Sequence, residues 1–411
     1  MIIRRRLTGA FRYRDYRLLW LLTMAGSIAV WMRILGSAQW LLEETGSAAM
    51  VGLIGVVQLV IQIPSTLWAG TLADLIDRKK LLIFSYGLTA LTLVSLAILS
   101  QAGWLTPLLV YLAVGISAAT YMLVGPARTA LIPIIFPEKD LMLATSTDTA
   151  THNVAAIVGP LIFAYVATSF DLTAVFAVAG LAAGVAMLMP ALMRINGRAE
   201  PSSDEQGRTQ FEQTVEGFRY LKNHPLLPGL YLLDIGITTS SFYREVLPVL
   251  ALGLFAGGAS ATGMLGASNS AGAILGSLFV LLLVGVRAKG MLVLYASFAY
   301  GIFLFGFGTV NSLILGMILI ALLGAADAVT VAVRTATVML TTPDHMRGRA
   351  FSLLFLTASS ANNIGTIWVG FWAGNIGAGN TMIMAGFISM LATALIWLVW
   401  KPIREFRSAA A

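Results

Sequence analysis

The chain has 411 residues, of which 58% are hydrophobic and only 11% are charged, and its mean hydropathy is +0.85. A soluble globular protein carries about 25% charged residues, so most of this chain's surface is expected to face a lipid bilayer. The absence of cysteine excludes disulfides and thiolate metal sites. No metal or cofactor is expected, because the three histidines are scattered and no phosphate-binding loop or nucleophile–base set occurs.

Twelve apolar runs are long enough to cross the bilayer as helices. In chain order we expect them over 17–42, 50–74, 81–101, 105–125, 142–168, 171–193, 226–255, 259–285, 290–310, 312–340, 346–375 and 378–401. The longest break, residues 194–223, holds the polar segment "NGRAEPSSDEQGR", and the "FEQTVEGFRYL" that follows is typical of an amphipathic surface helix.

The basic residues predict the orientation of these helices. All but two of the 26 Lys and Arg fall on one side of the membrane, whereas the breaks on the other side carry only acids such as Glu43, Glu44 and Asp171. Because cytoplasmic loops are enriched in Lys and Arg, both termini and the 194–223 linker are expected in the cytoplasm. The net charge of +7 is then a topology signal, and no nucleic-acid partner is needed.

The two halves of the chain repeat each other. The segment "ARTALIPIIFPEKDLMLATS" (127–146) matches "VRTATVMLTTPDHMRGRAFS" (333–352) at an offset of 206, and Gly70 and Gly276 share that offset. Nearer the start of each half the offset is 211, as between Gly52 and Gly263. We therefore expect an all-α membrane protein with two pseudo-symmetric six-helix halves, residues 1–193 and 224–411, joined by a cytoplasmic linker over 194–223.

The segment "GTLADLIDRKK" (70–80) resembles the signature between helices 2 and 3 of the major facilitator superfamily, with Leu75 and Asp77 departing from it. The stretches "RDYRLLW" (14–20), "GPARTALIPIIFPEKDL" (125–141) and "PDHMRGRAFSL" (343–353) resemble the branch that holds the enterobactin exporter and related macrolide and tetracycline efflux proteins. The resemblance implies a multi-pass transporter of the bacterial inner membrane, expected to act as a monomer.

The signature also implies a cytoplasmic gate. A carboxylate at residue 74 can accept the N–H groups at the start of a neighbouring helix in one state of the transporter and release them in the other. Arg128 and Arg334 occupy equivalent positions in the two halves. The expected gate residues are Gly70, Asp74, Arg78, Lys79, Arg128, Asp148 and Arg334.

The two remaining cations, Arg33 and Arg244, lie within helices 1 and 7 and are related by the offset of 211. By the family resemblance these helices line the central cavity, where a charged residue marks a substrate path. Two facing guanidinium groups would bind a carboxylate or phosphate. The alternative is that each arginine pairs with a buried acid and fixes packing. Tyr243 and Tyr121 complete the expected substrate-binding set.

Three intramembrane acids, Asp234, Glu245 and Asp327, are the expected proton-coupling residues, because a carboxyl in an apolar cavity can load and release protons. The sequence predicts no enzyme. It favours a proton-coupled exporter of an anionic or polar small molecule, with a siderophore as first candidate. Two alternatives stay open, namely a macrolide- or tetracycline-type multidrug efflux pump and a lysophospholipid flippase.

Overall fold

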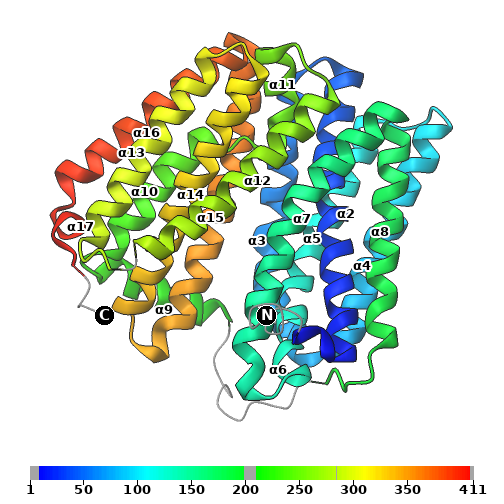
Figure 1. Ribbon diagram of the computed structural model, residues 1–411, viewed down its shortest axis with the longest axis horizontal. Coiled ribbons are helices and arrows are strands. Elements are labelled where there is room, and N and C mark those ends of the chain that lie inside the picture. Colours follow the sequence, from blue (N-terminus) through cyan, green and yellow to red (C-terminus); the bar gives the residue numbers. More distant parts are fainter. Residues whose placement is uncertain (1–8, 199–209, 284, 408–411) are drawn as a thin grey trace. The chain divides into compact units, whose positions relative to one another are not determined.

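The computed structural model describes residues 9–198, 210–283 and 285–407, and it shows helices and no strand in these ranges (Figure 1). From the amino-terminal end the elements are η1 (Ala10–Arg12), α2 (Arg14–Thr45), α3 (Ala48–Leu75), α4 (Arg78–Gln101), α5 (Pro107–Thr129), α6 (Ile132–Ile135), η2 (Glu138–Asp140), α7 (Leu141–Ser169) and α8 (Leu172–Leu192). They continue with α9 (Gln210–Asn223), α10 (Leu227–Ser241), η3 (Arg244–Val246), α11 (Leu247–Phe255), α12 (Ala259–Leu282), α13 (Lys289–Thr309), α14 (Leu313–Thr341), α15 (Asp344–Ile376), α16 (Ala378–Val399) and α17 (Lys401–Glu405).

Ten of the described helices are long and apolar enough to cross a membrane. The two further expected spans correspond to α15, which carries charged residues in its first turns, and to the segment from α10 to α11, which is not one continuous helix. The outward faces of the spanning helices are apolar, and side chains such as Leu91, Ile98 and Leu281 are exposed. Exposed aliphatic side chains on helix after helix are expected when lipid, not water, surrounds the protein.

The chain forms two compact units. One contains residues 1–41 and 60–205, and the other contains residues 42–59 and 206–411. Corresponding helices pack in the same way inside each unit: α4 packs on α8 and α5 in the first, and α13 packs on α16 and α14 in the second. The internal sequence repeat is thus matched by a repeated packing arrangement.

Glycines bring α12 and α14 close together in the second unit. A Cβ atom added to Gly272 would lie 1.8 Å from the Ala321 carbonyl oxygen, and one added to Gly276 would lie 2.4 Å from that of Ala325. Membrane helices pack through such small residues because lipid gives no hydrophobic drive for helices to associate. This contact fixes the part of α14 that leads into Asp327.

Candidate functional site

The seventh expected span is interrupted where its two charged residues lie. Helix α10 ends at Ser241, the 3-10 turn η3 covers Arg244–Val246, and α11 begins at Leu247. The expectation of one helix over 226–255 is therefore wrong at its centre. Pro248 gives a physical reason, because proline has no N–H to bond the Arg244 carbonyl and its ring collides with that carbonyl.

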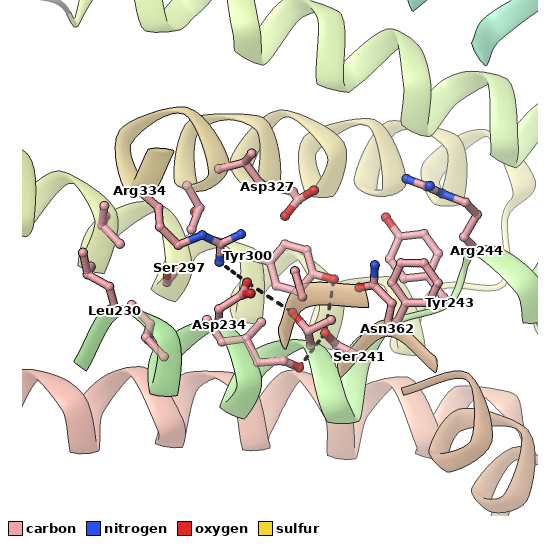
Figure 2. A pocket seen from close by; sticks show the side chains of 18 of the residues that line it. Leu230, Asp234, Ser241, Tyr243, Arg244, Ser297, Tyr300, Asp327, Arg334 and Asn362 are labelled. Carbon is pink, nitrogen blue, oxygen red and sulfur yellow. Dashed lines mark hydrogen bonds and ion pairs between the residues drawn. The ribbon is translucent and has the colours of Figure 1, made fainter. Parts of the chain in front are cut away.

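A cavity of about 260 Å³ lies beside this break, within the second unit. Its walls come from α10, the interruption, α12, α13, α14 and α15 (Figure 2). Four charged residues from the sequence-based candidate set line it together: Asp234, Arg244, Asp327 and Arg334. Sequence spacing alone does not place these residues on a common surface.

At one end of the cavity, Arg334 of α14 forms an ion pair with Asp234 of α10 (Figure 2). The Thr238 hydroxyl donates to the same carboxylate at 3.5 Å. Among the described residues, Nε of Arg334 and the hydroxyl of Ser297, both buried at this end, have no hydrogen-bond partner. A buried polar group without a partner is costly. This end therefore has unused hydrogen-bonding capacity beside the cavity.

Asp327 lies in the middle of the cavity wall. It precedes Arg334 on α14 by two turns, which is about 10 Å along the helix axis, and Figure 2 shows it between Arg334 and Arg244. Its side chain is exposed to the cavity. Within the described ranges its carboxylate makes no hydrogen bond or ion pair. An accessible carboxyl inside a membrane protein is suited to accepting and releasing a proton.

Arg244 lies at the other end, with its guanidinium 5.6 Å from the centroid of the Phe242 ring. It is the exposed member of the "YRE" triplet, whereas Tyr243 and Glu245 are buried. The Tyr243 hydroxyl accepts a hydrogen bond of 2.6 Å from the amide of Asn269 on α12. This bond holds the interrupted segment against a second helix, so Arg244 projects from a fixed backbone.

Glu245 does not belong to the cavity lining. Its two carboxylate oxygens accept hydrogen bonds of 2.9 and 3.1 Å from the side-chain amide of Gln58 on α3. Both side chains are buried, with exposed fractions of 6% for Glu245 and 7% for Gln58. The sequence-based proposal of proton coupling through Glu245 remains a prediction, and the geometry gives this carboxylate a local role in holding α3 against the turn η3.

The first unit contains a related arrangement. Arg128 of α5 forms an ion pair with Asp148 of α7 and lies 3.4 Å from the Thr23 hydroxyl of α2. Arg128 and Arg334 differ by the offset of 206, and Thr23 and Asp234 differ by 211. The repeat therefore places each arginine against the equivalent position of the first helix in its half, and only the helix that supplies the carboxylate differs.

The other expected substrate-binding residues, Arg33 and Tyr121, belong to the first unit. The Arg33 side chain is buried, with an exposed fraction of 6%, whereas Tyr121 is 52% exposed. The expectation that Arg33 faces Arg244 stays a prediction.

The expected gate segment is described in part. The side chains of residues 67–75 lie outside the described part of the chain, so the role of Gly70 and Asp74 stays a prediction. Arg78 donates to the Ala130 carbonyl at 3.1 Å, and the Lys79 ammonium donates to the Met193 carbonyl at 2.7 Å. Asp77, which departs from the family signature, caps α4 by accepting from the Lys79 and Lys80 amides. These contacts join the start of α4 to its neighbours.

Sequence reasoning missed several polar residues of the cavity, notably Asn269, Ser297, Tyr300 and Asn362. The Tyr300 hydroxyl donates to Ser241 at 3.3 Å, which links α13 to the end of α10. A usable signal existed for one of them, because the pair Asn362–Asn363 is unusual inside an apolar span. Single Ser and Tyr residues in such spans carry no comparable signal.

Comparison with known proteins agrees with this architecture. The profile of the transmembrane secretion effector family matches residues 8–411. The chain is 25% identical to the enterobactin exporter EntS of Shigella boydii serotype 4 over 390 residues, covering 93% of this chain and 88% of that protein. It is 26% identical to EntS of Escherichia coli O81 over 368 residues, covering 88% of this chain and 83% of that protein.

Two solved transporters share the fold at low sequence identity. The nucleoside transporter NupG superposes with a TM-score of 0.76 at 12% identity, covering 94% of this chain and 99% of NupG. A bacterial homologue of the human lysosomal transporter Spinster gives a TM-score of 0.67 at 15% identity, with 97% of this chain and 99% of the homologue covered. With its helical repeat, its apolar outer surface and a family match over nearly its whole length, the chain belongs to the transmembrane secretion effector family of major facilitator transporters.

Proposed function

We propose that the chain is a proton-coupled exporter of an anionic or polar small molecule in the bacterial inner membrane, with a siderophore as the first candidate. The observation that carries this proposal is the cavity in which Arg244 and Asp327 are both accessible. The relatives named as enterobactin exporters support the direction and the substrate class.

The charges of the cavity limit how substrate and proton exchange. The charges of the two arginines and the two aspartates sum to zero when all four side chains are ionised. Protonating Asp327 leaves a net positive cavity, which by itself strengthens the binding of an anion. Electrostatics alone would therefore bind proton and anion together, whereas an exporter driven by proton entry has to exchange them.

With a direct hydrogen bond between the substrate and Asp327, protonation of Asp327 weakens substrate binding instead of strengthening it. In the proposed cycle the anionic group of the substrate binds Arg244, and a hydroxyl or amine of the same molecule donates to the Asp327 carboxylate. A proton that reaches Asp327 from the outer side neutralises the carboxylate, which weakens its hydrogen bond to the substrate and releases the substrate. The ion pair of Arg334 with Asp234 keeps the second arginine neutralised during the exchange.

Inverted membrane vesicles test the proposal. We expect enterobactin to accumulate inside vesicles when a pH gradient is imposed, and to leave when a protonophore removes the gradient. Asp327→Asn should bind enterobactin more weakly than the wild type, because the neutral amide resembles the protonated carboxyl, and it should not concentrate enterobactin. A variant that concentrates enterobactin as well as the wild type would contradict coupling through Asp327.

The same vesicles separate the alternatives. Gradient-driven accumulation of a macrolide or tetracycline, without enterobactin, would identify a multidrug pump. Movement of a fluorescent lysophospholipid between leaflets, without accumulation of either soluble compound, would identify a flippase. Either result would overturn the siderophore proposal.

A further inference from the structure

A second cavity, of about 590 Å³, lies at the surface where α9 and α10 meet α16 and α17. Its walls include Lys222, His224, Pro225, Trp400 and Pro402. We propose that this cavity binds the headgroup of an anionic phospholipid. The proposal does not depend on which substrate the transporter carries.

The walls of this cavity are held in place by contacts within the second unit. The Trp400 indole N–H donates to the Pro225 carbonyl at 2.9 Å. Its ring also packs against Gly229 so closely that a Cβ there would lie 2.6 Å from it. Nδ1 of His224 accepts from the amides of Leu226 and Leu227, each at 3.2 Å. The shape of the cavity is therefore set before a ligand binds, which lowers the entropy cost of binding.

Lys222 supplies the positive charge. His224 is not a second cation, because its ring nitrogen acts as a hydrogen-bond acceptor and its burial lowers its pKa below the ordinary value. Lys222 is exposed, and within the described residues its ammonium has no hydrogen-bond or ion-pair partner. Lys401 and Arg404 of α17 add basic charge near the cavity, with Glu405 opposing it through a 3.6 Å contact to Lys401. Basic side chains at a membrane surface attract anionic headgroups.

The apolar surface leading to the cavity favours a lipid over a free anion. Helix α16 ends at this cavity, and its last residues Leu398 and Val399 are 70% and 71% exposed. Trp400 follows directly after this candidate span, and indole rings collect between hydrocarbon and water. An acyl chain along Leu398 and Val399 would bring its phosphate to Lys222, whereas a soluble phosphate would leave this apolar surface uncovered.

Thermal unfolding of the purified full chain in detergent, with lipid titrated in, tests the proposal. We expect phosphatidylglycerol to raise the melting temperature saturably, and an equal amount of phosphatidylcholine to raise it much less. Lys222→Gln should lose most of the difference between the two lipids, and Lys222→Arg should keep it. Lys139→Gln, which removes an exposed lysine of η2 in the first unit, should respond like the wild type.

Each comparison is made within one variant, so a change in basal stability does not obscure the lipid effect. Equal lipid responses in Lys222→Gln and Lys139→Gln would overturn the proposal. A full response to phosphatidylcholine would show that the site does not select anionic headgroups. If glycerol 3-phosphate alone reproduced the stabilisation, the site would bind a free phosphate and the lipid assignment would be wrong.

Discussion

Two neighbouring residues in the interrupted helix have different environments. Arg244 is exposed at the cavity, and Glu245 is buried against Gln58. Successive side chains of a 3-10 turn such as η3 point about 120° apart, so a single turn can present one residue to the cavity and the next to α3. The apolar run that surrounds them contains both a cation that faces the cavity and a carboxylate that is packed against α3.

Arg244 is expected to determine the binding of an anionic substrate. Arg244→Ala should abolish detectable binding of enterobactin, and Arg244→Lys should recover only part of it, because lysine keeps the charge but loses the two-pronged donor geometry. Isothermal titration calorimetry of the detergent-solubilised variants measures the enterobactin affinity of each. Full recovery by lysine would show that charge alone matters, and unchanged binding by the alanine variant would remove Arg244 from the site.

Ser297 should contribute to ligand binding and not to folding. The Ser297 hydroxyl is buried at the cavity and has no hydrogen-bond partner among the described residues. The Ser389 hydroxyl on α16 is also buried without a partner in the described part of the chain, but Ser389 does not line the cavity. Ser297→Ala should leave the melting temperature unchanged or raised, because it removes an unsatisfied group, and should weaken enterobactin binding by about tenfold, the equivalent of one hydrogen bond. Ser389→Ala should have the same effect on the melting temperature as Ser297→Ala, and it should leave enterobactin binding unchanged. Equal binding by the two variants would contradict the role of Ser297.

At the scale of elements, the two halves differ in the continuity of their first helix. Helix α2 runs without interruption over Arg14–Thr45, whereas the equivalent span breaks between α10 and α11. The offset of 211 places Ser37 where the second half has Pro248. Proline alone is not sufficient, since α3, α5 and α7 contain Pro64, Pro126 and Pro160 without a break.

Replacing this proline should extend the helix. Pro248→Ser restores the N–H that can bond the Arg244 carbonyl, so amides 246–250 should exchange hydrogen more slowly with solvent than in the wild type. Arg244 should then move away from the cavity and anion binding should weaken. Pro190→Ser in α8 is the control, because that proline lies in an uninterrupted helix. Unchanged exchange in Pro248→Ser would show that the cavity contacts, not the proline, maintain the break.

The turn between α9 and α10 should make stability depend on pH. Burial lowers the pKa of His224, although a hydrogen bond to the Thr341 backbone opposes the shift. The neutral ring caps α10, so the stabilisation is complete above the unfolded-state pKa of about 6.5. This stabilisation is lost as the pH falls below the unfolded-state pKa and through the lower pKa of His224 in the folded protein, because the unfolded chain binds the proton at a higher pH than the folded chain does. The melting temperature of His224→Asn should fall less than that of the wild type between pH 7 and pH 5. Identical pH profiles would exclude this capping role.

At the scale of the whole molecule, the features that could be predicted from the sequence are those that follow from repeating patterns along the chain. Hydropathy located the spans, and the offsets of 206 and 211 located the equivalent positions of Arg128 and Arg334. The convergence of Asp234, Arg244, Asp327 and Arg334 on one cavity could not be predicted, because it depends on how α10, α14 and the interruption pack. The break itself was missed, since Pro248 in an apolar run does not differ locally from the prolines that α3, α5 and α7 accommodate.

Because the two halves repeat each other, we expect that the carboxylate partner of Arg128 can be moved from residue 148 on α7 to residue 23 on α2. Asp148→Asn should destabilise the protein by about 3–5 kcal/mol, because it leaves the buried Arg128 without its counter-charge. Thr23 lies 3.4 Å from Arg128 and is the equivalent of Asp234, the partner of Arg334. Adding Thr23→Asp to Asp148→Asn should therefore rebuild in the first unit the pairing that the second unit uses. The double variant should recover most of the lost stability in thermal unfolding, and Thr23→Asn with Asp148→Asn should not. If the aspartate rescued no more than the asparagine, Arg128 and Arg334 would not be interchangeable parts of one repeated ion-pair arrangement.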